Sequence, residues 1–295
     1  MPATDTVTTA TPATPSAPQP RRRHRRARLV LRYLLLSIGA VIILFPLYMA
    51  IVNSLLEPSQ ISHQPPPLFP THPQWHTYPT AWTTGHLAVY LRNSAIQTFI
   101  IVAGQLITSI LAAYAFAFLE FPFKRTLFVV FLMTLMIPFE VTVATNLSTV
   151  SSLGWFNTFP GLTVPFLATG FGTFLLRQAF LQIPTDLKEA AQLDGYGNFR
   201  FLWSVAIPLA RPAIAALGVF SFLAAWNQYL WPLLVTGNDN SIRTVQIGLK
   251  QLLNTQLDQI NVSLAGTIIA IVPLIILLII FQKQLVRSLT AGAVK

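Results

Sequence analysis

The sequence predicts an all-α integral membrane protein with six transmembrane helices and both termini in the cytoplasm. Three observations carry this prediction. Charged residues make up only 9% of the 295 residues and hydrophobic residues 53%, whereas soluble domains carry roughly 25% charged residues. Apolar stretches of about 20 residues, the length that a helix needs to cross a hydrocarbon core of about 30 Å, recur along the chain. The basic residues gather on one side of these stretches, and the positive-inside rule makes that side cytoplasmic.

The two ends of the chain should lie outside the membrane. Residues 1–20 are mostly Thr, Pro, Ala and Ser, and a run of arginines follows; such a composition has little to bury. We expect residues 1–28 to be a disordered cytoplasmic arm, residues 29–282 the six-helix membrane domain, and residues 283–295 a cytoplasmic tail. The first apolar stretch is too long for the core of a cleaved signal, which has about 7–15 residues.

The six expected spans can be placed by hydropathy. They fall near residues 31–52, 94–119, 127–146, 161–181, 212–235 and 262–281. Several contain a proline: Pro46, Pro138, Pro165, Pro232 and Pro273. In a membrane bundle, neighbouring helices can satisfy the carbonyls that a proline frees, so kinked spans are expected.

The distribution of the cations accounts for the net charge of +10. With this topology, 16 of the 19 Lys and Arg lie on the cytoplasmic side, and only Arg92, Arg243 and Lys250 lie outside. The arginines before the first span are placed to meet anionic lipid headgroups. The basic excess is therefore a topology signal, and no nucleic-acid partner is expected.

Two longer segments lie on the outer side. Residues 57–92 are rich in proline and aromatic residues, which is typical of a loop at the membrane interface. Their histidines, His63, His72 and His76, match no ligand spacing, so no metal is expected. Residues 237–261 are polar, and this segment is a candidate contact for an extracytoplasmic partner.

Catalytic chemistry needs a cluster of reactive side chains, and the spans contain none, so the chain is not expected to be an enzyme. Glu140, after Pro138, is the one carboxylate at membrane depth, where ionisable groups are costly and often functional. Two interpretations stay open. Glu140 is either a carboxylate bonded to backbone near a kinked helix end, or the proton relay of a stand-alone proton-coupled secondary transporter.

The loop of residues 183–212 between the fourth and fifth spans is the most specific feature. Pro184 and Asp186 are helix-start signals, and Asp186 with Glu189 has capping-box spacing. Gly195 and Gly197 can end the helix in left-handed conformations. The loop is therefore expected to form two short helices with a glycine turn.

This loop also carries an apolar side. Its members are Leu187, Ala190, Ala191, Leu193, Phe199, Phe201, Leu202 and Trp203. Exposed apolar area of this size marks a docking surface. The alternative, that these residues pack under their own bundle, is equally open.

The order of motifs resembles the permease subunits of binding-protein-dependent ABC importers. The family signature E-A-A-x-x-D-G is matched by Glu189, Ala190, Ala191, Asp194 and Gly195, and I-P-L follows around Pro208. F-P-x-K-R at 121–125, the M-I-P-x-E-V run through Glu140, L-G-W-x-N-T-x-P-G-L-x-x-P at 153–165 and the terminal L-T-A-G-A-V-K at 289–295 also fit. They are similar to the second permease of carbohydrate importers, of the maltose (MalG-like) and glycerol-3-phosphate (UgpE-like) branches.

The resemblance implies a division of labour. The E-A-A loop would be a coupling helix in a cleft of a cytoplasmic ATPase dimer, and the C-terminal tail, Gly292 and Lys295 included, would reach the ATPases. A second permease subunit and an extracytoplasmic substrate-binding protein would complete the importer in a bacterial or archaeal cell membrane. ATP and Mg²⁺ would be used by the partner ATPase and no cofactor by this chain, which has no G-x-x-x-x-G-K-[ST] loop.

The fifth span offers the candidate translocation surface. Trp226 and Tyr229 suit stacking on sugar faces, and Asn227 and Gln228 suit hydrogen bonds to hydroxyls. An interfacial aromatic belt with interhelical amide bonds is the alternative. Because no Lys or Arg lies mid-span, a phosphorylated substrate would need positive field from helix N-termini or from the partner subunit. Otherwise the substrate is a neutral sugar.

Overall fold

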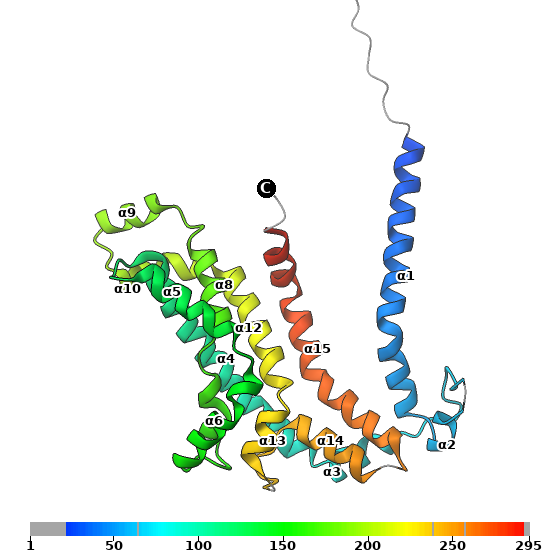
Figure 1. Cartoon of the computed structure of the whole chain (residues 1–295). Coiled ribbons are helices and arrows are strands. Elements are labelled where there is room, and N and C mark those ends of the chain that lie inside the picture. Colours follow the sequence, from blue (N-terminus) through cyan, green and yellow to red (C-terminus); the bar gives the residue numbers. More distant parts are fainter. Residues whose placement is uncertain (1–21, 64, 238, 257, 292–295) are drawn as a thin grey trace, which may run out of the picture. The chain divides into compact units, whose positions relative to one another are not determined.

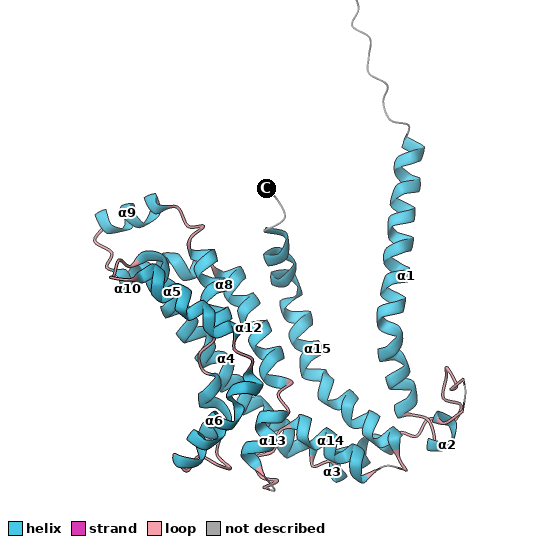
Figure 2. Cartoon of the chain, viewed as in Figure 1, coloured by secondary structure: helices cyan, strands magenta, loops and turns pink. Residues whose placement is uncertain are grey.

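The computed structural model describes residues 22–63, 65–237, 239–256 and 258–291, and every regular element in this part of the chain is helical (Figures 1 and 2). It divides into two compact units, residues 1–49 and 50–295. The helices in order are α1 (Arg22–Ser54), α2 (Pro58–Ile61), α3 (Thr77–Thr84), α4 (Leu87–Phe118), α5 (Lys124–Met133), η1 (Thr134–Met136), α6 (Phe139–Ser152), α7 (Phe159–Thr163), η2 (Val164–Phe166), α8 (Gly170–Phe180), α9 (Thr185–Leu193), α10 (Asn198–Phe201), η3 (Leu202–Ala206), α11 (Ile207–Leu209), α12 (Arg211–Trp226), α13 (Leu230–Thr236), α14 (Val245–Thr255) and α15 (Ile260–Ala291).

The first unit is the greater part of helix α1. The helix begins at Arg22, so its first turns include the end of the segment 1–28 that was expected to be disordered. Apolar side chains from Leu29 to Phe45 are exposed along it, as suits a helix surrounded by lipid. Pro46 lies inside the helix without ending it.

Three helices of the described chain are long and apolar enough to span a membrane, namely residues 28–54 of α1, α4 and residues 260–283 of α15. Three more candidate spans are helix pairs bent at a short break, by 96° between α5–η1 and α6, by 45° between α7–η2 and α8, and by 79° between α10–α11 and α12. The count is thus three to six. Of the prolines that were expected to kink spans, Pro138 and Pro165 lie at bent pairs, whereas Pro46 and Pro273 lie inside continuous helices and Pro232 lies inside α13.

Proline explains the largest of these bends. Pro138 is the N-cap of α6, and Ile137 before it is extended at ψ 112°. A proline supplies no N–H and disfavours helical conformation in the residue before it. The third expected span therefore divides at Ile137 into two helices.

The prediction of one fifth span over residues 212–235 is wrong. Helix α12 ends at Trp226, and α13 starts only at Leu230. The Nδ2 of Asn227 donates to the carbonyl of Leu223 at 2.8 Å, and the backbone N–H of Asn227 donates to the same carbonyl at 3.2 Å, so Asn227 closes the last turn of α12. The three residues between the helices thus form a polar break.

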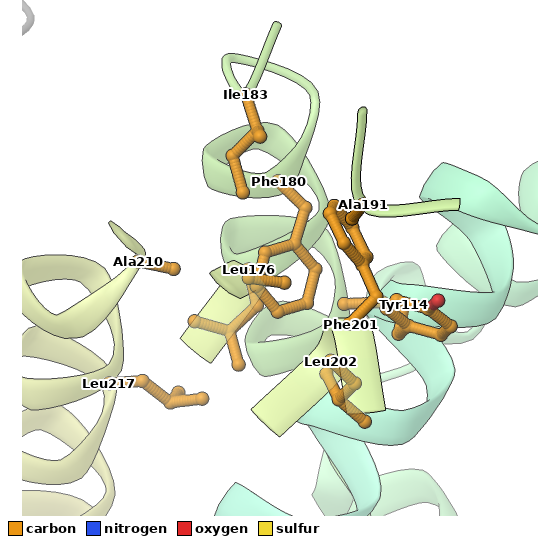
Figure 3. Close-up of a cluster of buried hydrophobic side chains, with 11 residues drawn as sticks. Tyr114, Leu176, Phe180, Ile183, Ala191, Phe201, Leu202, Ala210 and Leu217 are labelled. Carbon is orange, nitrogen blue, oxygen red and sulfur yellow. The ribbon is translucent and has the colours of Figure 1, made fainter. Parts of the chain in front are cut away.

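The second unit is organised around α4. This helix contacts α3, α7, α8, α12 and α14, and three clusters of buried side chains hold the packing. One joins α4, α8 and the segment 183–217 and is drawn in Figure 3. A second joins α3, α4, α14 and α15, and a third joins α6, α7 and α13. Within this unit α9 and α10 lie at one end of α4, while α3, α13 and α14 lie at the other (Figure 1).

Candidate functional site

The loop of residues 183–212 folds as two short helices, α9 and α10, joined by a turn, as predicted. Gly195 has φ +79°, so it adopts the left-handed conformation expected of it. Gly197 does not, because it is extended at φ −75° and serves as the N-cap of α10. The predicted capping box is also absent, since the N-cap of α9 is Pro184 and no side-chain cap bond is formed there.

Helix α9 is attached to the end of α4. Ala191 is 8% exposed and packs in the cluster that contains Phe180 and Phe201 (Figure 3). The Nζ of Lys188 donates to the carbonyl of Phe118 at 2.7 Å and lies 5.7 Å from the centre of that ring. A small residue and a cation therefore fix α9 against the last turn of α4.

The rest of α9 and the turn after it are open. Leu193 is 90% exposed, and Leu187, Phe199 and Trp203 are also exposed, as are Glu189, Ala190 and Asp194. Neither carboxylate forms an ion pair within the described chain. The two interpretations of the apolar side thus apply to different residues, because Ala191 packs under its own bundle while its neighbours form a free surface.

Pro208 lies in the helical connection between α10 and α12 and not in α9. It lies in α11, directly after the π-helical segment η3, and it is half-buried. Ala206 and Ala210 on either side are buried in the cluster of Figure 3. The I-P-L motif therefore anchors the loop to the bundle.

The four residues of the expected translocation surface differ in their exposure and their contacts. Trp226 is 3% exposed and stacks on Phe222 at 5.5 Å and 9°, so that face of its ring is covered. Asn227 accepts a hydrogen bond from Gln246 of α14 at 3.3 Å, and Gln228 accepts one from Gln97 of α4 at 2.7 Å. These amides bind other helices, as the interhelical alternative expected.

Two members of this set line cavities. Trp226 lines one of about 620 Å³ with Arg92 and Phe222, and Tyr229 lines the cavities beside α14. Tyr229 is 38% exposed and lines a cavity of about 560 Å³ with Gln246 and Lys250 of α14. It also lines a second cavity, of about 320 Å³, with Arg243. Arg243 and Lys250 were expected to be outer cations in a segment that contacts an extracytoplasmic partner, and not to line a cavity with Tyr229. The signal that could have identified this grouping is that residues 237–261 hold two of the three cations predicted to lie on the outer side.

Glu140 lies in the first turn of α6 and is exposed. A carboxylate at this position is favoured by the partial positive charge of a helix N-terminus. No hydrogen bond of its carboxylate to backbone is found among the described residues. The interpretation of Glu140 as a carboxylate bonded to backbone therefore has no supporting contact in this part of the chain. Within the same residues, no group of three or more His, Cys, Asp or Glu is arranged to hold a metal ion. Gly292 and Lys295 lie outside the described residues.

Comparison with known proteins gives the family. A family model described as "Binding-protein-dependent transport system inner membrane component" matches residues 105–291. The chain belongs to this family. The sn-glycerol-3-phosphate transport system permease protein UgpE of Yersinia pestis is 36% identical over 265 residues, covering 87% of this chain and 94% of the relative. UgpE of Agrobacterium fabrum is 36% identical over 269 residues, covering 88% and 95%.

Solved structures share the fold. The chain matches a crystal structure of a bacterial ABC transporter involved in the import of the acidic polysaccharide alginate, with a TM-score of 0.75 and 22% identity over 90% of this chain and 99% of that chain. A crystal structure of the alginate transporter in complex with a periplasmic protein gives a TM-score of 0.62 and 15% identity. The family match and the UgpE relatives make this chain a permease subunit of an ABC importer and a multi-pass inner membrane protein, as the motifs and the hydropathy predicted.

Proposed function

We propose that this permease forms part of the path by which an ABC importer takes up a carbohydrate or a glycerol phosphate. The observation that carries this proposal is the 36% identity to glycerol-3-phosphate permeases along 87% of the chain. The partner that delivers the solute is a substrate-binding protein on the outer side. A second, related permease subunit completes the path.

In this proposal the chain crosses the membrane six times, with three straight spans and three bent ones, and both termini are cytoplasmic. The support is the 16 to 3 division of the cations together with the placement of α9 and α14 at opposite ends of α4. Because the chain has no cysteine, single cysteines report topology directly. A maleimide should label Leu193→Cys only from the cytoplasmic side and Asn254→Cys only from the outer side.

Helix α9 is the coupling element. Its exposed residues Leu187, Glu189 and Leu193 dock on a cytoplasmic ATPase dimer, and Lys188 and Ala191 pass the movement to α4 and α8. ATP and Mg²⁺ are bound by the ATPases, and this subunit binds no cofactor. The C-terminal residues Gly292 and Lys295 are proposed to touch the same ATPases.

The test is ATP hydrolysis by the complete complex in proteoliposomes, with the loaded binding protein added. Glu189→Lys and Gly195→Pro should abolish the stimulated hydrolysis without lowering expression. Gln192→Lys is the matched control, because it puts the same charge on an exposed residue of α9 outside the motif positions. Unchanged stimulation in Glu189→Lys would refute the coupling role. Uptake that survives removal of ATP and all partners, but is lost in Glu140→Gln, would instead indicate a proton-coupled carrier.

A further inference from the structure

The outer end of the second unit holds a run of cavities along the polar side of α14. The first, of about 560 Å³, and the second, of about 320 Å³, share Tyr229 and Lys250. The second and a third, of about 230 Å³, share Gln251 and Thr255. Amides, hydroxyls and two cations line this stretch of surface, together with the apolar side chains of Leu249, Leu253, Ile260 and Leu264 in the first cavity.

Arg243 is the unusual member of this lining because it is a cation with only 9% of its surface exposed. Its Nη1 donates to Oδ1 of Asn240 at 2.9 Å and to Oε1 of Gln251 at 3.2 Å, and its Nη2 donates to the carbonyl of Gly237. Its Nε has no hydrogen-bond partner among the described residues. Within that part of the chain the guanidinium is oriented by neutral acceptors, and no carboxylate lies within 4 Å of it.

The backbone beneath the guanidinium is fixed to α4. The Nδ2 of Asn93 donates to the carbonyls of Ser241 at 2.8 Å and of Arg243 at 3.0 Å. The backbone N–H of Val245 donates to Oγ of Ser94 at 2.8 Å. Asn93, Ser94 and Val245 are buried, so the backbone that carries the cation is held in place before any ligand arrives.

Lys250 adds a second positive charge to the same cavity. It is exposed and makes no hydrogen bond or ion pair within the described chain, where the one ion pair joins Lys124 to Glu120. The acidic group that Arg243 does influence is Asp239. Hydrogen bonds from Ser241 lower the pKa of that carboxyl, and the charge of Arg243 lowers it further. Asp239 is nonetheless beyond 4 Å of the guanidinium, so the cavity keeps an excess of positive charge.

The chemistry of this lining fits a phosphate monoester. Such a group carries about −1.5 to −2 charges at pH 7, which is close to the combined charge of the two cations. A ligand with a single carboxylate would carry only about one negative charge. Arginine binds phosphate through charge-assisted hydrogen bonds, and lysine binds it as a point charge. The neighbouring amides Gln246 and Asn254 suit the hydroxyls of a small polyol.

We propose that Arg243 and Lys250 form a phosphate-binding subsite at the outer mouth of the transport path, which selects a phosphorylated polyol over a neutral sugar. The inference rests on the proposed function, because it assigns a substrate class to that same path. The cations that a phosphorylated substrate needs come from the outer segment before α14 and from α14 itself, so none is required mid-span.

The test is uptake of labelled glycerol-3-phosphate by the complete importer in proteoliposomes. Lys250→Gln should raise the half-saturating concentration about tenfold, as expected for the loss of one charge-assisted contact. Lys250→Arg, which keeps the positive charge, should have the half-saturating concentration of the wild type. Arg243→Lys, which keeps the charge but not the fork of donors, should raise it as well. Arg92→Gln is the matched control, because Arg92 is an exposed outer cation that lines none of the three cavities.

Inorganic phosphate separates recognition of the phosphate group from recognition of the polyol. It should inhibit uptake by the wild type and inhibit Lys250→Gln less. Two results would overturn the subsite and leave the proposed function standing. One is an importer that takes up only neutral carbohydrate, and the other is an unchanged half-saturating concentration in both Lys250→Gln and Arg243→Lys. Weaker docking of the binding protein, with unchanged dependence on solute, would assign the cations to that protein instead. Absence of both uptake and stimulated ATP hydrolysis would refute the proposed function itself.

Discussion

Replacing Gly248 by alanine should loosen the seam between α14 and α4. A Cβ atom on Gly248 would lie 2.2 Å from Cδ2 and 2.8 Å from Cε2 of Tyr90, so the ring or the helix must move by about 1.2 Å to restore ordinary contact at about 3.4 Å. The ring has little freedom, because Tyr90 is 1% exposed and its hydroxyl donates to Gln251 at 3.4 Å.

The magnitude follows from two opposed effects. Overpacking costs about 1–3 kcal/mol, while alanine in place of glycine within a helix returns about 1 kcal/mol. Gly248→Ala should therefore lower the stability of the purified protein by about 1 kcal/mol, seen as a lower midpoint of thermal unfolding in detergent. Gly218→Ala is the control, because its Cβ would meet only Leu106 Cδ1 at 3.9 Å. It should be stabilising.

A double-mutant cycle identifies the clash. If the ring of Tyr90 is the obstacle, the destabilisation in Gly248→Ala combined with Tyr90→Leu should be smaller than the sum of the two single effects. A Gly248→Ala protein as stable as Gly218→Ala, or strictly additive effects, would refute the argument that these two positions set the distance between α14 and α4.

Three further predictions concern other parts of the second unit. Trp231→Phe removes the donor at 3.1 Å to a buried carbonyl of α7 and should cost about 1–2 kcal/mol, measured as a lower unfolding midpoint than in a surface Trp75→Phe control. Asp239→Asn should flatten the acid side of the stability profile. Hydrogen bonds from Ser241 lower the pKa of Asp239 below its ordinary 3.8, so its stabilising contribution is complete above that value and is lost as the pH falls through the folded pKa; a thermal series from pH 5 to 3 that is identical in the two proteins would contradict this. Gly195→Ala places a side chain at φ +79° at a cost of about 1–2 kcal/mol, so limited proteolysis should cut the loop after α9 faster than in Gly197→Ala, where φ is −75°.

The straight spans and the two-helix form of the loop 183–212 were easier to predict from the sequence than the fifth span. A run of apolar residues is enough to place α4 and α15, because burial in lipid depends on composition over a whole turn or more. The break after Trp226 depends on Asn227 and Gln228 finding Gln246 and Gln97 on other helices. Partners so distant in the sequence leave no local pattern, so hydropathy continued the helix through the break.

Distance in the sequence also decides which parts of the candidate site could be predicted. The motif around Glu189 is continuous in the sequence and was identified from its order of residues. The grouping of Tyr229 with Arg243 and Lys250 arises only when α14 packs on α4 and beside the end of α12. The sequence places Arg243 and Lys250 in one polar segment, but their shared cavity with Tyr229 depends on packing between helices, which leaves no local pattern.

Helix α4 gives the two ends of the molecule a common mechanical part. Its 32 residues extend over about 48 Å. Its last turn accepts the bond from Lys188 of α9, and its first turn carries the ring of Tyr90 against α14. With no internal proline, α4 lacks the commonest cause of a sharp kink. If α9 moves as the proposed coupling requires and keeps its bond to α4, this one helix would carry the displacement to the wall of the cavities beside α14.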